Sequence, residues 1–283
     1  MAQELIVLQP RMQVERWTIE KKLGEYALKV EGVAEQIQVL KMEVYVLAEF
    51  TKRGSRHFCK IEDKRRYGSF NYVVMTLVRK SLQDLNKGGP GGHMTLGSLE
   101  DLHNIGYLHR DVKPGNYTIG RAELNKLRKV YVLDFGMCRK FTNDQDVIRK
   151  PNQAAGFRGT VRYAPISGHL QRELCRKDDC ETWVYMIVEF TYGRVPWKEV
   201  QDMIQVGEYK KRVRQPTYIM ELFPPPGNFQ TSDHSKILFK AIHYDAPNYQ
   251  MIYGLVRQAL QSSHVHDYPY DWEMGGPTAY LLH

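Results

Sequence analysis

Two carboxylates, a lysine and an asparagine stand near the middle of the chain, and these residue types suit the handling of a phosphate group. Asp111, Lys113 and Asn116 fall within the run HRDVKPGN at 109–116, and Asp134 opens a DFG tripeptide further on. Phosphoryl transfer asks little covalent work of a protein, but it needs an aligned nucleophile and neutralised phosphate charge. A carboxylate base, a cation and oxygen ligands for a metal meet those needs. The set therefore indicates phosphoryl transfer.

A second group of polar residues stands near the start of the chain. Lys29 follows Ala27 in a strand-like run, and Glu43 lies in a following segment with helical spacing. A strand lysine and a helix glutamate are each usually surface residues.

The elements that must position these residues differ along the chain. Period-two alternation predicts strands at 17–23 and 26–30, and β-rich composition predicts another at 70–77. Helical spacing covers 36–49. The first part of the chain is therefore expected to form a small sheet with one helix.

The character of the sequence changes after a glycine-rich break at 86–93. A short helical segment then leads into HRD, a strand-like stretch covers 129–133, and the remainder is mostly helical with a proline-rich interruption at 223–228. The predicted fold class is α+β, with a small β-rich part ahead of a larger helical part.

The HRDVKPGN run with its downstream DFG resembles the catalytic and metal loops of protein kinases. The resemblance implies that Asp111 accepts or orients the proton of the substrate hydroxyl, and that Lys113 steadies the γ-phosphate of ATP. It implies that Asn116 and Asp134 hold magnesium ions, and that the substrates carry serine or threonine. Chance tripeptides in a basic protein are the plain alternative, which their order and spacing disfavour. We expect a two-lobed protein kinase fold with ATP and Mg²⁺ between the lobes.

The resemblance also assigns nucleotide contacts upstream of HRD. Lys29 and Glu43 would form the ion pair that holds the α- and β-phosphates. Met75 would lie behind the adenine, and the backbone of Thr76 and Val78 would hydrogen-bond it; a plain core strand is the simpler reading. The residues expected at the nucleotide are Leu23, Ala27, Lys29, Glu43, Met75, Thr76, Val78 and Asp134.

The segment after DFG carries a narrower resemblance. Residues 156–164 (GFRGTVRYA) resemble the GTxRYAS element of the casein kinase 1 group, and with the closing DWE at 271–273 they resemble the tau-tubulin kinases. The likeness spans 14–273. It implies a small lobe at 14–78, a larger lobe at 79–273 and a tail at 274–283.

In that group a basic pocket recognises a phosphate or an acidic side chain on the protein substrate. Arg162 matches its central arginine, and Lys210 and Lys211 are candidate helpers. An arginine in this position can equally be a structural salt-bridge partner. Asp179 matches an acid that fixes the backbone of the HRD loop.

Two departures from the family pattern favour an alternative function. The chain runs Leu23-Gly24-Glu25 directly into Tyr26, where kinases carry a glycine-rich hairpin over the phosphates, and the helical stretch before HRD is shorter than the family's. A pseudokinase or scaffold with impaired catalysis is therefore the second hypothesis, and a shortened product or omitted segments would leave the same gaps.

The bulk composition restricts the kinds of partner that the protein can bind, but it does not identify a reaction. The 283 residues are 42% hydrophobic, and 40 Lys and Arg against 32 Asp and Glu leave a net charge of +8, which attracts anions. The basic residues are scattered, so a nucleic-acid-binding protein is the least favoured reading. The four cysteines show no paired spacing and no stretch reaches membrane-spanning length. We expect a reduced, cytoplasmic monomer, with the nucleus as a further location, that binds no membrane.

Overall fold

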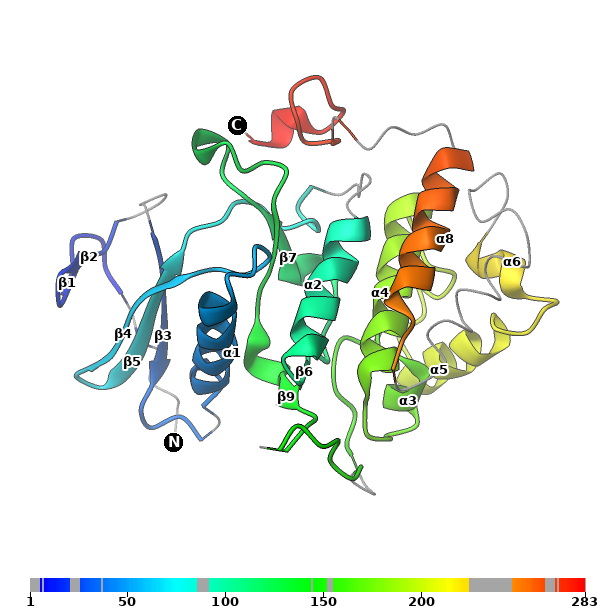
Figure 1. Cartoon of the computed structure of the whole chain (residues 1–283), viewed down its shortest axis with the longest axis horizontal. Coiled ribbons are helices and arrows are strands. Elements are labelled where there is room, and N and C mark those ends of the chain that lie inside the picture. The colour runs from blue at the N-terminus through cyan, green and yellow to red at the C-terminus, as the bar shows by residue number, and fades with distance from the viewer. Residues whose placement is uncertain are drawn as a thin grey trace.

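The computed structural model describes residues 6, 8–20, 26–36, 38–85, 92–143, 145–151, 155–223, 246–262, 268 and 270–282. Strands gather at one end of the molecule and helices at the other (Figure 1). The mixed arrangement of small sheets and several helices confirms the α+β fold class.

A three-stranded antiparallel sheet forms the β-rich end (Figure 1). Its strands are β3 (Tyr26–Gly32), β4 (Ile61–Tyr67) and β5 (Phe70–Thr76), in the order β3-β5-β4. The register sets Ala27 opposite Met75 and Lys29 opposite Val73. Because paired residues and alternate residues of a strand share a face, these four side chains lie on one face of the sheet.

A separate short hairpin covers the opposite face. It consists of β1 (Gln13–Val14) and β2 (Trp17–Thr18), and Val14 packs against Tyr72 and Val74 of β5. The expected strand at 17–23 is therefore wrong in its extent among the described residues, because β2 spans only Trp17–Thr18 and its pairing with the first strand stops after the backbone hydrogen bonds of Ile19 to Met12 and Arg11. Residues 21–25, which include Leu23, lie outside the described part of the chain.

Helix α1 (Leu40–Arg53) packs on the Lys29 face of the sheet (Figure 1). It begins later than the expected residue 36, because the buried Glu31 carboxylate accepts hydrogen bonds from the amides of Val39 and Leu40 at 2.6 and 2.9 Å. That carboxylate satisfies amides that have no partner within a helix. The helix ends at Gly54, whose φ of 67° suits glycine.

Short strand pairs and 3₁₀ turns join the two ends of the molecule. Helix α2 (Gly92–Asn104) precedes them. The pairs are β6 (Tyr107–Leu108) with β9 (Arg139–Lys140), and β7 (Tyr117–Ile119) with β8 (Val130–Val132). The turns are η1 (Pro114–Asn116), η2 (Ala122–Leu124) and η3 (Phe135–Met137).

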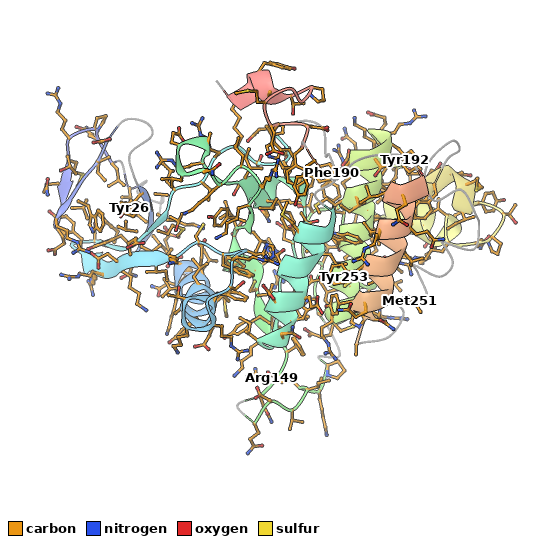
Figure 2. The ribbon with its side chains drawn as sticks, turned by 45° about the horizontal axis from the view of Figure 1, so that its top comes forward. Tyr26, Arg149, Phe190, Tyr192, Met251 and Tyr253 are labelled. Carbon is orange, nitrogen blue, oxygen red and sulfur yellow. The ribbon has the colours of Figure 1, made fainter. Side chains whose placement is uncertain are left out.

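The helical end is built around α4 (Arg176–Tyr192), which is buried along most of its length. The other elements here are α3 (Ile166–His169), α5 (Met203–Arg212), α6 (Ile219–Leu222), α8 (Tyr249–Ser262) and η4 (Ala279–Leu282). Tyr253 on α8 lies toward α2 (Figure 2), and its hydroxyl donates to the Glu100 carboxylate at 2.7 Å.

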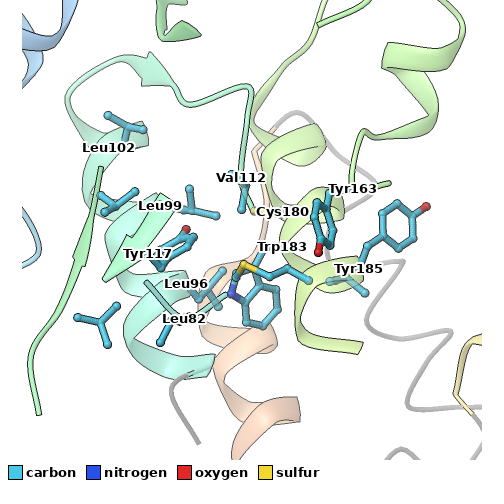
Figure 3. Close-up of a cluster of buried hydrophobic side chains, with 14 of the residues drawn as sticks. Leu82, Leu96, Leu99, Leu102, Val112, Tyr117, Tyr163, Cys180, Trp183 and Tyr185 are labelled. Carbon is cyan, nitrogen blue, oxygen red and sulfur yellow. The ribbon is translucent and has the colours of Figure 1, made fainter. Parts of the chain in front are cut away.

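The core of the helical end lies between α2, β7 and α4 (Figure 3). Leu96, Leu99 and Leu102 of α2 are fully buried there, together with Trp183 of α4. The indole of Trp183 donates to the Thr95 hydroxyl at 2.9 Å, so its polar atom is satisfied as well. The short helix before HRD therefore still presents a continuous apolar face to its neighbours.

The end of the chain packs back onto this core. Trp272 is buried, and its indole donates to the Leu127 carbonyl at 2.9 Å. Within the part of the chain that the structure describes, no helix is both long and apolar enough to cross a membrane.

Candidate active site

The Asp111 carboxylate is the centre of a compact polar cluster. Lys113 Nζ lies 2.6 Å from its Oδ2, and the Thr160 hydroxyl donates to its Oδ1 at 2.8 Å. The Asn116 side-chain amide donates to the Asp111 carbonyl at 2.8 Å. Asp111 is 5% exposed. Lys113 and Thr160 therefore hold the two oxygens of a nearly buried carboxylate in place.

The β7–β8 pair brings Asn116 close to Asp134. Asn116 ends η1 just before β7, and its carbonyl accepts from the amide of Leu133 at 2.8 Å. Leu133 immediately precedes Asp134, which is exposed and has a φ of 62°. Phe135 turns the other way into the core, where it is fully buried. The DFG turn therefore presents its carboxylate outward on the same end of the hairpin as Asn116.

Asp179 of α4 fixes the backbone of the HRD run. Its carboxylate accepts from the amides of His109 and Arg110 at 2.7 and 2.8 Å, and its Oδ2 lies 2.9 Å from Nε2 of His103. Burial alone would raise the pKa of Asp179, but the hydrogen bonds from His103 and His109 outweigh it and lower the pKa. Arg110 has a φ of 67°, a conformation that needs such external support.

Gly159 allows the downstream segment to approach this loop. Its φ is 94°, and a Cβ at this position would lie 2.9 Å from the Arg110 carbonyl oxygen. Only glycine fits so close to another backbone at this φ. The approach brings the next residue, Thr160, within reach of Asp111.

Lys29 and Glu43 form the expected ion pair, with Lys29 Nζ 2.5 Å from Glu43 Oε2. Burial raises the pKa of Glu43, Lys29 opposes that effect, and the nearby charge of Asp134 adds to it. Asp134 is therefore close enough to α1 for its charge to act on Glu43, which links the pair on the sheet to the DFG turn.

The residues expected at the adenine lie at the end of β5. Met75 is 6% exposed on the same face as Ala27, and Val78 packs half-buried against the main core. The Thr76 amide donates to the Lys60 carbonyl at 3.0 Å, so this donor is engaged by the chain itself. Of the predicted nucleotide contacts, Leu23 falls outside the described residues.

A cavity of about 590 Å³ lies on the opposite face of the sheet from Lys29. Trp17, Tyr26, Leu28 and Val74 are among the residues that line it, and Ala27, Lys29 and Met75 are not. This cavity is separate from the cluster around Asp111.

The three basic residues assigned to a substrate phosphate have different surroundings. The Arg162 side chain is 41% exposed, with Nη1 3.4 Å from Glu189 Oε1, and Lys211 is 40% exposed beside Glu208. Lys210 is fully buried, and its ammonium contacts the chain's own carbonyls. The prediction that Lys210 contacts a substrate phosphate is therefore wrong, because its ammonium is buried against the chain and not open to a ligand.

The donors at Asn116 and Asp134 fit magnesium. The Asn116 amide nitrogen is committed to the Asp111 carbonyl, which leaves its side-chain oxygen for another partner, and Asp134 offers an exposed carboxylate. Mg²⁺ prefers such oxygens and usually takes one or two protein ligands beside substrate phosphates. No group of three or more His, Cys, Asp or Glu suited to a metal occurs among the described residues, and a phosphate-bound ion does not need one.

Thr160 is the site residue that the sequence argument did not single out. Its hydroxyl contacts Asp111 and lies 3.3 Å from Lys113 Nζ. Gly159 next to it is the signal that could have found it, since a glycine often marks a close backbone approach.

The sheet with α1, the helical end and the polar cluster between them define a two-lobed protein kinase fold. A protein named as a serine/threonine kinase in Dictyostelium discoideum is 34% identical over 92% of this chain, and the chain spans 57% of that relative's length. A serine/threonine kinase of Caenorhabditis elegans is 34% identical over 88% of the chain and 69% of its own length. A third relative, from the same worm and assigned by name to casein kinase I, is 30% identical over 91% of the chain and 78% of its length.

The chain belongs to the serine/threonine protein kinases. No family model matches it. The likeness to these relatives covers both ends of the molecule, so it includes the sheet as well as the HRD and DFG segments.

Proposed function

We propose that this chain transfers the γ-phosphate of ATP to serine or threonine hydroxyls of proteins. The observation that carries the proposal is the held Asp111 carboxylate, with Lys113 and Thr160 donating to its two oxygens. A carboxylate fixed in this way can accept the proton of a substrate hydroxyl, and the adjacent ammonium can offset charge on the transferred phosphate.

Asn116 and Asp134 would hold magnesium, which neutralises phosphate charge when bound. Lys29, oriented by Glu43, would contact the nucleotide phosphates from the sheet, and Ala27, Met75, Thr76 and Val78 would surround the adenine. The residues at 14–78 and 79–273 would be the two lobes, with 274–283 as a tail.

The finer assignment is to the casein kinase 1 group and its tau-tubulin kinases, which act on acidic or phospho-primed segments. The exposed guanidinium of Arg162, which stands two residues after Thr160, supports it, with Lys211 as a second cation. Arginine forms paired hydrogen bonds with phosphate oxygens, and a primed substrate would place a phosphate within its reach.

The test measures phosphate transfer from ATP with magnesium to casein and to matched primed and unprimed peptides. Transfer by the wild type and its loss in Asp134→Ala support the kinase. An Arg162→Ala variant that keeps the wild-type preference for primed peptide removes the substrate assignment while leaving the kinase in place.

One observation favours the pseudokinase alternative. Among the described residues the sheet ends at β3, and no strand pairs with its outer edge, where a glycine-rich hairpin would lie. A protein without transfer activity and without measurable nucleotide binding would fit that alternative and contradict the kinase.

A further inference from the structure

Lys210 lies under the loop that follows Thr160, and its ammonium is the point at which that loop is held. The residue is fully buried, with 0% solvent exposure. Nζ donates to the Val161 carbonyl at 2.8 Å and to the Ala164 carbonyl at 2.7 Å. Two carbonyls three residues apart therefore turn inward onto one cation.

The third contact of the ammonium is with α3. Nε2 of His169 lies 3.1 Å from Lys210 Nζ. Burial and the charge of Lys210 lower the pKa of His169 to about 4, so the imidazole is neutral at pH 7 and accepts at Nε2 when its proton is on Nδ1. Gly207 permits this approach, because a Cβ there would lie 3.0 Å from the His169 side chain.

Aromatic and charged groups complete the surroundings of the ammonium. It lies 5.1 and 5.2 Å from the ring centroids of Tyr185 and Trp197, distances suited to cation–π contact. Burial lowers the pKa of Lys210 to about 7, Glu181 opposes that effect and Arg214 adds to it. Glu181 and Arg214 pair with each other at 2.7 Å. The amine is therefore enclosed by acceptors and aromatic rings of the chain itself, with no exposure to solvent.

The loop held by Lys210 is continuous with the catalytic cluster. Thr160, which donates to Asp111, is the residue before Val161. The Trp197 indole holds the same loop by donating to the Arg162 carbonyl at 2.8 Å. A shift of the loop would therefore move both the Thr160 hydroxyl and the exposed Arg162 side chain.

We propose that Lys210 is a positioning residue for the protein substrate: it fixes residues 160–164 so that Thr160 meets Asp111 and the substrate hydroxyl is aligned. The inference rests on the proposed kinase function. Without the ammonium, two buried carbonyls lose their donors and the loop must move to satisfy them. A displacement of about 1 Å in a positioning element can lower turnover about 10²-fold.

The experiment compares Lys210→Met, which removes every donor, with Lys210→Gln, whose amide keeps two N–H groups. Lys198→Met is the control, because Lys198 is an exposed lysine outside the site. Peptide kcat/KM, ATP KM and nucleotide affinity are measured for each protein. We expect Lys210→Met to lower peptide kcat/KM about 10²-fold with ATP KM and nucleotide affinity unchanged, and Lys210→Gln to recover about tenfold of the loss.

Wild-type peptide kcat/KM in both Lys210 variants would overturn the inference, as would an equal loss of nucleotide affinity, which indicates general damage. If Lys210→Met does not fold, Lys210→Gln decides, with amide hydrogen exchange at 160–164 as its second measurement: faster exchange there supports the anchor and unchanged exchange contradicts it. An inactive wild type contradicts the kinase proposal instead, and the exchange measurement still tests the anchor.

Discussion

The Thr160 hydroxyl donates a hydrogen bond of 2.8 Å to the Asp111 carboxylate, joining the HRD loop to the segment after DFG. Lys113 donates to the other oxygen of the same carboxylate. The orientation of the proposed base is therefore set from two different parts of the chain. Any change that moves either donor is expected to act on turnover rather than on nucleotide binding.

Asp111→Asn should abolish most phosphate transfer while leaving the fold intact. The amide has the shape of the carboxylate but cannot accept a proton, and a positioned general base contributes about 10²–10⁴-fold in rate. Steady-state transfer to peptide and nucleotide affinity by calorimetry are the measurements. A variant with wild-type kcat would show that Asp111 does not handle the proton.

Glu43→Gln should weaken the contribution of Lys29 to nucleotide handling. Hydrogen bonds to charged groups contribute about 1.5–3 kcal/mol, so kcat/KM for ATP should fall about 10–150-fold. Glu49→Gln is the matched control, because Glu49 pairs with Lys52 on the exposed side of the same helix. Equal effects of the two substitutions would show that the Lys29–Glu43 pair has no special role.

Asp179→Ala should destabilise the fold and the HRD loop together. The substitution leaves the buried amides of His109 and Arg110 without acceptors. Each unsatisfied amide should lower the free energy of unfolding by about 1–3 kcal/mol. Because the folded-state pKa of Asp179 is lowered, its contribution is present above the unfolded pKa of about 3.9 and is lost as the pH falls through the folded pKa. Urea unfolding at pH 7 and below pH 4 measures this, and the gap between wild type and variant should narrow in acid.

Sequence reasoning reached the fold class and the kinase family because both depend on residue types at short spacings. The HRD and DFG runs are local patterns, and the order of Lys29 and Glu43 anticipated the ion pair that the structure contains. The start of α1 was missed because Glu31, nine residues before Leu40, caps it through its side chain. A cap formed from a preceding strand leaves no signal at the helix boundary.

The prediction that Lys210 contacts a substrate phosphate was wrong for a related reason. A Lys-Lys-Arg cluster at 210–212 resembles a solvated basic face, and only the packing of α5 against α3 tells the buried lysine from the exposed Lys211 beside it. Likewise, the contact of Thr160 with Asp111 joins segments that are far apart in sequence. Burial and long-range contacts of this kind are properties of tertiary structure, which local patterns do not encode.

Lys210→Met should remove a pH dependence from the stability of the protein. Burial lowers the pKa of Lys210 to about 7, while an unfolded chain holds its lysines near 10.4. Between these values the unfolded chain binds more protons, so the unfolding free energy of the wild type relative to the variant should rise with pH, by up to about 1.4 kcal/mol per pH unit. Urea unfolding of both proteins at several pH values from 6 to 9 measures the difference in unfolding free energy, because the urea midpoint follows stability. A difference that stays level with pH, as expected for the Lys198→Met control, would mean that the buried amine keeps its ordinary pKa.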